Sequence, residues 1–111
     1  KINLLKAAHE LNKKIVMSGG AGGKMDPTKL IVADIAETYN CVFVKMVRKR
    51  LKREKIYTGI PVVFSTELPD RKSLILTDGK NYKKSAYGTI SYLPATFGSV
   101  CASVVIRDLI E

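Results

Sequence analysis

The sequence has few of the residues on which disulfide and metal chemistry depend. Only two of its 111 residues are cysteines, Cys41 and Cys101, and they lie far apart with no Cys-x-x-Cys pair. This excludes a disulfide framework and a cysteine-rich metal site, and it favours a reducing, intracellular setting. The single histidine, His9, excludes a site built from several histidines. We therefore expect no metal in this chain and a cytoplasmic location.

Acidic residues are also scarce. Ten acids face nineteen lysines and arginines, which gives a net charge of +9 and favours an anionic partner such as nucleic acid. Asp26, Asp34, Glu37 and Glu67 are single acids without an evident partner, and a cysteine nucleophile would have to use His9 as its base, a pairing that nothing supports. The sequence thus presents no catalytic constellation of its own.

Long apolar runs are missing as well. The longest mostly apolar stretch, residues 95–106, is too short to span a bilayer and is followed by Arg107 and Asp108, so we expect no membrane segment here. Small residues recur along this stretch at helical spacing, and we expect them to pack closely against another element. They are Ala95, Gly98, Ser99, Ala102 and Ser103.

A glycine-rich stretch, MSGGAGGKMDP at residues 17–27, invites comparison with phosphate-binding loops. A P-loop needs Gly-x-x-x-x-Gly-Lys-Ser/Thr, but counting back from Gly23-Lys24 places Ser18 at the first glycine and Met25 at the hydroxyl position. A dinucleotide-binding pattern begun at Gly20 also fails at Met25, and Pro27 follows where a helix would have to start. We interpret the stretch as a connection between strands, or as a place where the backbone approaches something closely.

Residues 45–55, KMVRKRLKREK, are basic at seven of eleven positions. On a helix these cations share a broad face, which is typical of either a solvated surface or a phosphate-binding surface. The cations that we single out as candidates for nucleic-acid binding are Lys45, Arg48, Lys49, Lys52 and Arg53. The nearby aromatic residues Tyr39, Phe43 and Tyr57 are too sparse for a base-stacking platform.

The hydrophobic pattern predicts one α/β domain. A helix that runs directly into a short buried strand is typical of the second half of a βαβ unit, whose first strand we expect before Lys1. The predicted helices cover residues 1–14, 41–55 and 94–110. The predicted strands cover residues 15–17, 29–36 and 62–66, with a further extended segment at 88–93 and an exposed loop or hairpin at 68–84.

Several stretches together resemble the C-terminal half of the ThiF/MoeB/HesA adenylating family, which is ubiquitin-activating-like. They are KKIVMSGGAGGKMDPTKLIVADIAET, VRKRL, VVFSTELP and GTISYLPATFGSVCASVVIRDL, in this order over nearly the whole chain. The likeness is greatest to the branch of tRNA threonylcarbamoyladenosine dehydratases. It implies the C-terminal part of a Rossmann-like fold, with a mixed sheet flanked by helices, and residues 1–111 as a single incomplete domain that lacks its N-terminal nucleotide-binding part.

The resemblance implies an ATP-dependent enzyme, with Mg²⁺, that adenylates a carboxylate and cyclises threonylcarbamoyladenosine in tRNA. Its catalytic residues would precede Lys1, so this chain alone would be inactive and hold no cofactor. The residues expected near nucleotide or substrate are Lys1, Gly19, Gly20, Gly22, Gly23 and Lys24. A tRNA partner and a homodimer are expected. Two alternatives stay open: activation of the C-terminus of a ubiquitin-like or sulfur-carrier protein, and a non-enzymatic basic module that binds nucleic acid.

Overall fold

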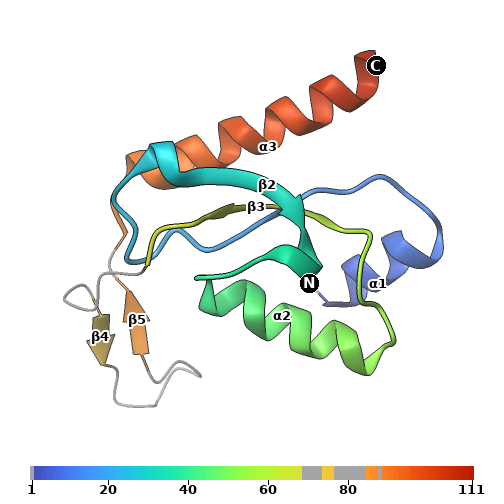
Figure 1. The fold of residues 1–111 in the computed structure, drawn as a ribbon, viewed down its shortest axis with the longest axis horizontal. Helices are drawn as coiled ribbons and strands as arrows, with labels where there is room; N and C mark the ends of the chain where they lie inside the picture. The colour runs from blue at the N-terminus through green and yellow to red at the C-terminus, as the bar shows by residue number, and fades with distance from the viewer. Residues whose placement is uncertain (1, 69–73, 77–84, 88) are drawn as a thin grey trace.

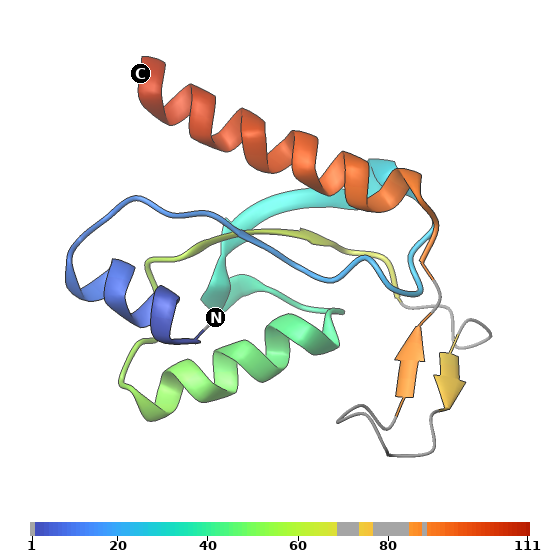
Figure 2. The ribbon, with the colours of Figure 1, turned by 180° about the vertical axis from the view of Figure 1, so that it is seen from behind.

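The computed structural model describes residues 2–68, 74–76, 85–87 and 89–111. Strands β1 (Met17–Ser18), β3 (Pro61–Ser65) and β2 (Leu30–Asp34) form one sheet in that order. Helices α1 (Ile2–Glu10) and α2 (Val42–Arg53) cover one face of this sheet, and α3 (Tyr92–Ile110) covers the other, as Figures 1 and 2 show from opposite sides. The described body is therefore a three-layer α/β/α arrangement.

The sheet is mixed, as expected from the sequence. β1 runs parallel to β3, with Met17 opposite Val62, whereas β2 runs antiparallel to β3, with Leu30 opposite Ser65. All three strands were predicted, with bounds that differ by one or two residues at each end. The parallel pair places the carboxyl ends of β1 and β3 at the same edge, which is where open α/β sheets bind ligands.

β3 is the central strand because its side chains are apolar on both faces. Val62 and Phe64 point into the cluster under α1 and α2, while Val63 packs under Leu93 and Phe97 of α3. A strand covered on both faces reads as a continuous apolar run, as this one does in PVVFS.

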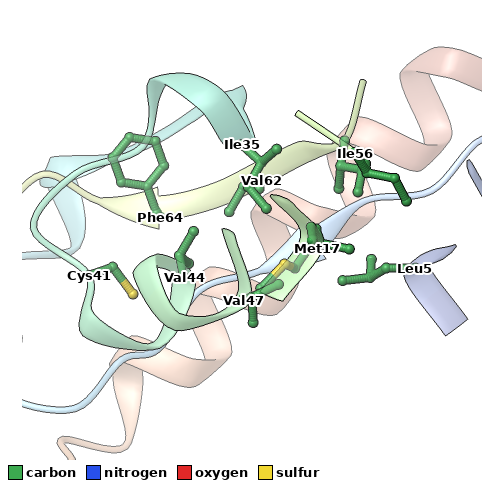
Figure 3. Packing of buried hydrophobic residues seen from close by; sticks show 11 residues of the cluster. Leu5, Met17, Ile35, Cys41, Val44, Val47, Ile56, Val62 and Phe64 are labelled. Atoms are coloured by element: carbon green, nitrogen blue, oxygen red, sulfur yellow. The ribbon is translucent and has the colours of Figure 1, made fainter. Parts of the chain in front are cut away.

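Helix α2 packs through three residues at helical spacing, Val44, Val47 and Leu51, each at most 3% exposed. Figure 3 shows Val44 near the strand residues Val62 and Phe64, and Val47 beside Met17. The helix ends where Lys55 takes a left-handed φ of 61° and the amide of Ile56 donates to Leu51 O. This is a Schellman-type end, and the predicted helix 41–55 is confirmed within two residues.

Helix α1 is shorter than predicted. It ends at Glu10 rather than at residue 14, because Asn12 adopts φ 54° and the amide of Lys13 donates back to Ala8 O at 2.8 Å. Asparagine tolerates this left-handed conformation at a helix end better than most residues. Leu5 is buried against α2 and the sheet, whereas Leu4 and Leu11 are exposed.

Helix α3 spans 19 residues and contacts the sheet through Leu93 and Phe97, with Val100 and Val104 partly buried beside them. The small residues expected to pack closely instead lie on the side turned away from the sheet, and the prediction was wrong. Ala95, Gly98, Ser99, Ala102 and Ser103 are all exposed, and nothing lies within 4 Å of a Cβ built on Gly98. The larger residues take the inner side because they bury more apolar area.

By length and composition alone, α3 would suffice to cross a membrane, with a mean hydropathy of 1.4. This is weak evidence, because core helices of soluble proteins can have the same composition. The absence of a membrane segment stays a prediction.

A second, two-stranded sheet stands apart from the three layers (Figure 1). β4 (Leu74–Leu76) pairs antiparallel with β5 (Ser85–Tyr87), which agrees with the hairpin alternative for residues 68–84. Much of the predicted loop, residues 69–73 and 77–84, lies outside the described part of the chain. The extended segment predicted at 88–93 is wrong at its end, because α3 already begins at Tyr92, and Gly88 lies outside the described residues.

Candidate functional site

The glycine-rich stretch lies at the carboxyl end of β1 and leads into a single 3₁₀ turn, η1 (Pro27–Lys29), before β2. We call residues 19–26 the glycine loop. It connects two strands, as predicted, but its backbone is held in place by contacts with neighbouring segments. Gly23 has φ 73°, a left-handed conformation that favours glycine.

The first two amides of the glycine loop donate hydrogen bonds within the protein. The amide of Gly19 donates to Val63 O at 2.7 Å, and that of Gly20 donates to the thiol of Cys41 at 3.4 Å. Cys41 is the residue before α2, so these bonds tie the loop to the central strand and to the start of that helix.

Lys24, the lysine of the glycine loop, is 2% exposed. Its ammonium donates to the carbonyl of Asn40 at 2.6 Å and to the carbonyl of Glu67. Burial lowers the pKa of this ammonium below its ordinary value, and the thiol of Cys41 and the carboxylate of Glu67 oppose that shift. In this conformation the ammonium faces protein carbonyls rather than the open edge of the sheet.

Glu67, which follows β3, is hydrogen-bonded through its side chain to the backbone of the same loop. Its carboxylate accepts from the amide of Met25 at 3.0 Å and from that of Asp26 at 2.9 Å. The hydroxyl of Tyr92, in the first turn of α3, donates to Met25 O at 2.7 Å. The sequence showed Glu67 only as a single acid without a partner, although the stretch VVFSTELP that carried the resemblance contains it.

These contacts decide what the glycine loop can do chemically. Five of its amides, those of residues 19, 20 and 24–26, donate within the protein. Among the residues described, no buried side-chain nitrogen or oxygen lacks a partner, and no group of three or more metal-ligating side chains gathers. Five of the eight loop amides are therefore engaged within the protein, and the described side chains do not gather into a site for a Mg²⁺ ion. Gly22 and Gly23 lie within the same loop, and Lys1 lies outside the described residues.

The basic residues of α2 divide into two sets. Lys45, Lys49, Lys52 and Arg53 are exposed. Arg48 is only partly exposed and donates to the carbonyl and hydroxyl of Thr38, at 2.9 and 2.7 Å. Four of the five candidate cations of α2 are thus exposed. The fifth, Arg48, is bonded to Thr38 in the segment before the helix.

Known proteins match the chain over most of its length. It is 40% identical over 95 residues to tRNA threonylcarbamoyladenosine dehydratase 2 of Saccharomyces cerevisiae, a match that covers 84% of this chain and 21% of the yeast protein. It is 30% identical over 118 residues to the tRNA threonylcarbamoyladenosine dehydratase of Bacillus subtilis, covering all of this chain and 46% of that one. No family model matches the chain.

The fold agrees with the sequence matches. The crystal structure of Escherichia coli tRNA N6-threonylcarbamoyladenosine dehydratase in complex with AMP superposes with a TM-score of 0.80 at 28% identity, over 98% of this chain and 43% of that one. The chain spans less than half the length of each of these relatives. In sequence and in fold, the chain is related to the tRNA threonylcarbamoyladenosine dehydratases, which confirms the resemblance expected from its motifs.

Proposed function

We propose that the protein to which this chain belongs is an ATP-dependent enzyme that dehydrates threonylcarbamoyladenosine in tRNA to a cyclic form. The observation that carries the proposal is the agreement of fold over 98% of the chain with a dehydratase whose structures contain AMP or ATP. A carboxylate is a poor electrophile, and ATP supplies its activation. Mg²⁺ would accompany ATP, as with most nucleotide-dependent enzymes.

Among the described residues, no group of three or more metal-ligating side chains gathers. Five of the eight amides of the glycine loop are bonded within the protein, and the Lys24 ammonium is bonded to two carbonyls. We therefore assign no catalytic residue and no nucleotide ligand within the described part of the chain. Its role would be to complete the sheet and to shape the edge beside the reaction.

The exposed cations of α2 support tRNA as the partner. Lys45, Lys49, Lys52 and Arg53 lie on one helix, and only one acid, Glu54, follows them directly. That carboxylate is paired with Lys6 of α1 at 2.8 Å. Such a surface binds the phosphates of a nucleic acid and does not distinguish its base sequence. This suits a tRNA whose reacting base is recognised by another part of the protein.

A homodimer is also proposed. The outer side of α3 has small residues in its N-terminal half and larger ones in its C-terminal half, where Ile106 and Leu109 are 56% and 79% exposed. An antiparallel pairing of two copies would set large residues against small ones, which is the self-complementarity that a two-fold interface requires. A cytoplasmic location remains our expectation, based on the two cysteines, which are both free.

The test uses the full-length protein with ATP and tRNA that carries threonylcarbamoyladenosine. We expect ATP consumption that depends on this tRNA, together with loss of one water mass from the modified nucleoside in mass spectrometry. Pyrophosphate exchange driven by a carrier protein with a Gly-Gly tail, and not by tRNA, would instead select the carrier-activating alternative. RNA binding with no ATP turnover under either condition would select the non-enzymatic alternative.

A further inference from the structure

Lys24 and Glu67 hold one another's segments in a reciprocal arrangement. The side chain of Lys24 donates to the backbone carbonyl of Glu67, while the side chain of Glu67 accepts from the backbone amides of Met25 and Asp26, the two residues after Lys24. Each side chain therefore fixes the other's backbone, across 43 positions of sequence. We call this pair of residues the reciprocal clamp.

The reciprocal clamp joins three segments at the carboxyl edge of the sheet. Besides Glu67, the Lys24 ammonium bonds the carbonyl of Asn40, whose own side-chain amide donates to Thr66 O at 2.8 Å. Asn40 has φ 56°, a left-handed conformation that sets the direction of its carbonyl. The glycine loop, the turn before α2 and the end of β3 are thus closed into one hydrogen-bonded ring.

The chemistry of the reciprocal clamp differs from that of a phosphate-binding lysine. A phosphate ligand needs an ammonium that is free to meet a ligand at an open edge, whereas Lys24 is 2% exposed and two of its three donors are bonded to carbonyls. Removing the Lys24 side chain would leave two carbonyls without their donor, and removing the Glu67 side chain would leave two amides without their acceptor. The arrangement favours one conformation of the glycine loop.

We propose that Lys24 and Glu67 are positioning residues, which set the glycine loop and the end of β3 for the dehydratase reaction without touching nucleotide or tRNA. The inference rests on the proposed function. The glycine loop follows β1 and Glu67 follows β3, whose parallel carboxyl ends share one edge. A change in either residue would therefore move both sides of that edge together.

The experiment is a double-mutant cycle in the full-length protein with Lys24→Met, Glu67→Ala and the double variant. Lys29→Met is the matched control, since Lys29 is an exposed lysine next to the same loop. Each variant is assayed for ATP-dependent dehydration well below its unfolding temperature, and hydrogen exchange is followed in the peptide that contains Met25 and Asp26.

We expect each single variant to lower kcat by about 10²-fold, the size of effect that a misplaced supporting group produces, and the double variant to lose no more than either single one. Exchange at Met25 and Asp26 should rise by about tenfold or more in all three variants, because these amides lose their acceptor or its support, and should not change in Lys29→Met.

Three results would overturn the proposal. The first is a rise in the KM for ATP in Lys24→Met alone, with multiplicative losses in the double variant, which would mark a direct phosphate ligand. The second is unchanged kcat with a lowered Tm, which would mark a purely structural role. The third is unchanged exchange at Met25 and Asp26. If the wild-type protein shows no ATP- and tRNA-dependent turnover, the proposed function fails, while the exchange data still decide whether the clamp holds the loop. If a single variant does not fold, Glu67→Gln replaces Glu67→Ala and Lys24→Gln replaces Lys24→Met in the cycle.

Discussion

The amide of Gly19 and the carbonyl of Val63 are bonded at 2.7 Å, and a Cβ placed on Gly19 would lie only 3.1 Å from the same oxygen. The side chains of Phe64 and Val44 would each lie 3.3 Å away. A glycine is needed here because the glycine loop leaves β1 directly against the central strand and α2. Gly20, one residue later, has only ordinary contacts, at 3.6 Å or more.

We therefore predict that Gly19→Ala destabilises the protein by about 1–3 kcal/mol, the usual cost of overpacking a filled site. The matched control, Gly20→Ala, should change the free energy of unfolding by less than about 1 kcal/mol. Urea unfolding of the two full-length variants measures the difference. Equal stability of the two variants would show that the neighbours of Gly19 can shift to accommodate a methyl group.

A second prediction concerns the pH dependence of stability at Lys24. Burial lowers the pKa of its ammonium in the folded state, so between that pKa and the ordinary lysine value of about 10.4 the unfolded chain binds more protons. The contribution of this group to the free energy of unfolding should therefore increase as the pH rises through that window.

The measurement compares wild type with Lys24→Met by chemical unfolding at several alkaline pH values, so that other titrating groups cancel. The stability advantage of wild type over the variant should grow toward pH ~10. A difference that shrinks with rising pH would show that the charged form is favoured by the fold, contrary to the cause given above.

The third prediction tests the surface of α2. Changing Lys45, Lys49, Lys52 and Arg53 singly to Gln should weaken tRNA binding. Each change should also lower the slope of log K against log salt by roughly one for every phosphate that the side chain had neutralised. Fluorescence anisotropy over a range of salt concentrations measures both quantities.

Arg48 supplies the internal control for that series. Since its guanidinium is bonded to Thr38, Arg48→Gln should cost about 1–3 kcal/mol of stability and leave the salt slope unchanged. A decrease in slope equal to that of its exposed neighbours would return Arg48 to the set of phosphate-binding residues.

The fourth prediction addresses self-association through α3. Ile106→Asp and Leu109→Asp place a charge on the exposed apolar side of the helix and should convert a dimer to a monomer in light scattering. Arg107→Asp introduces the same acid on another side of the helix and should have little effect. A dimer that withstands both apolar substitutions would place the interface elsewhere.

Several features of this protein follow from its sequence alone. The spacing of Val44, Val47 and Leu51 predicts a helix with one apolar side, and the β-branched and aromatic run from Val62 to Phe64 predicts a strand. The missing hydroxyl after Gly23-Lys24 is enough to reject a P-loop. These features depend on residues close together in the chain, so a local pattern contains the information.

The tertiary structure alone decided the partners of Lys24, Glu67 and Arg48, and the side of α3 that faces the sheet. Lys24 and Glu67 are 43 positions apart, and no local pattern shows that one buries its charge against the other's carbonyl. Nor could periodicity choose between two uncharged sides of α3, because both are apolar enough to be buried. Which side was covered depended on the larger area that Leu93 and Phe97 bury against Val63, and that gain exists only once the sheet has formed.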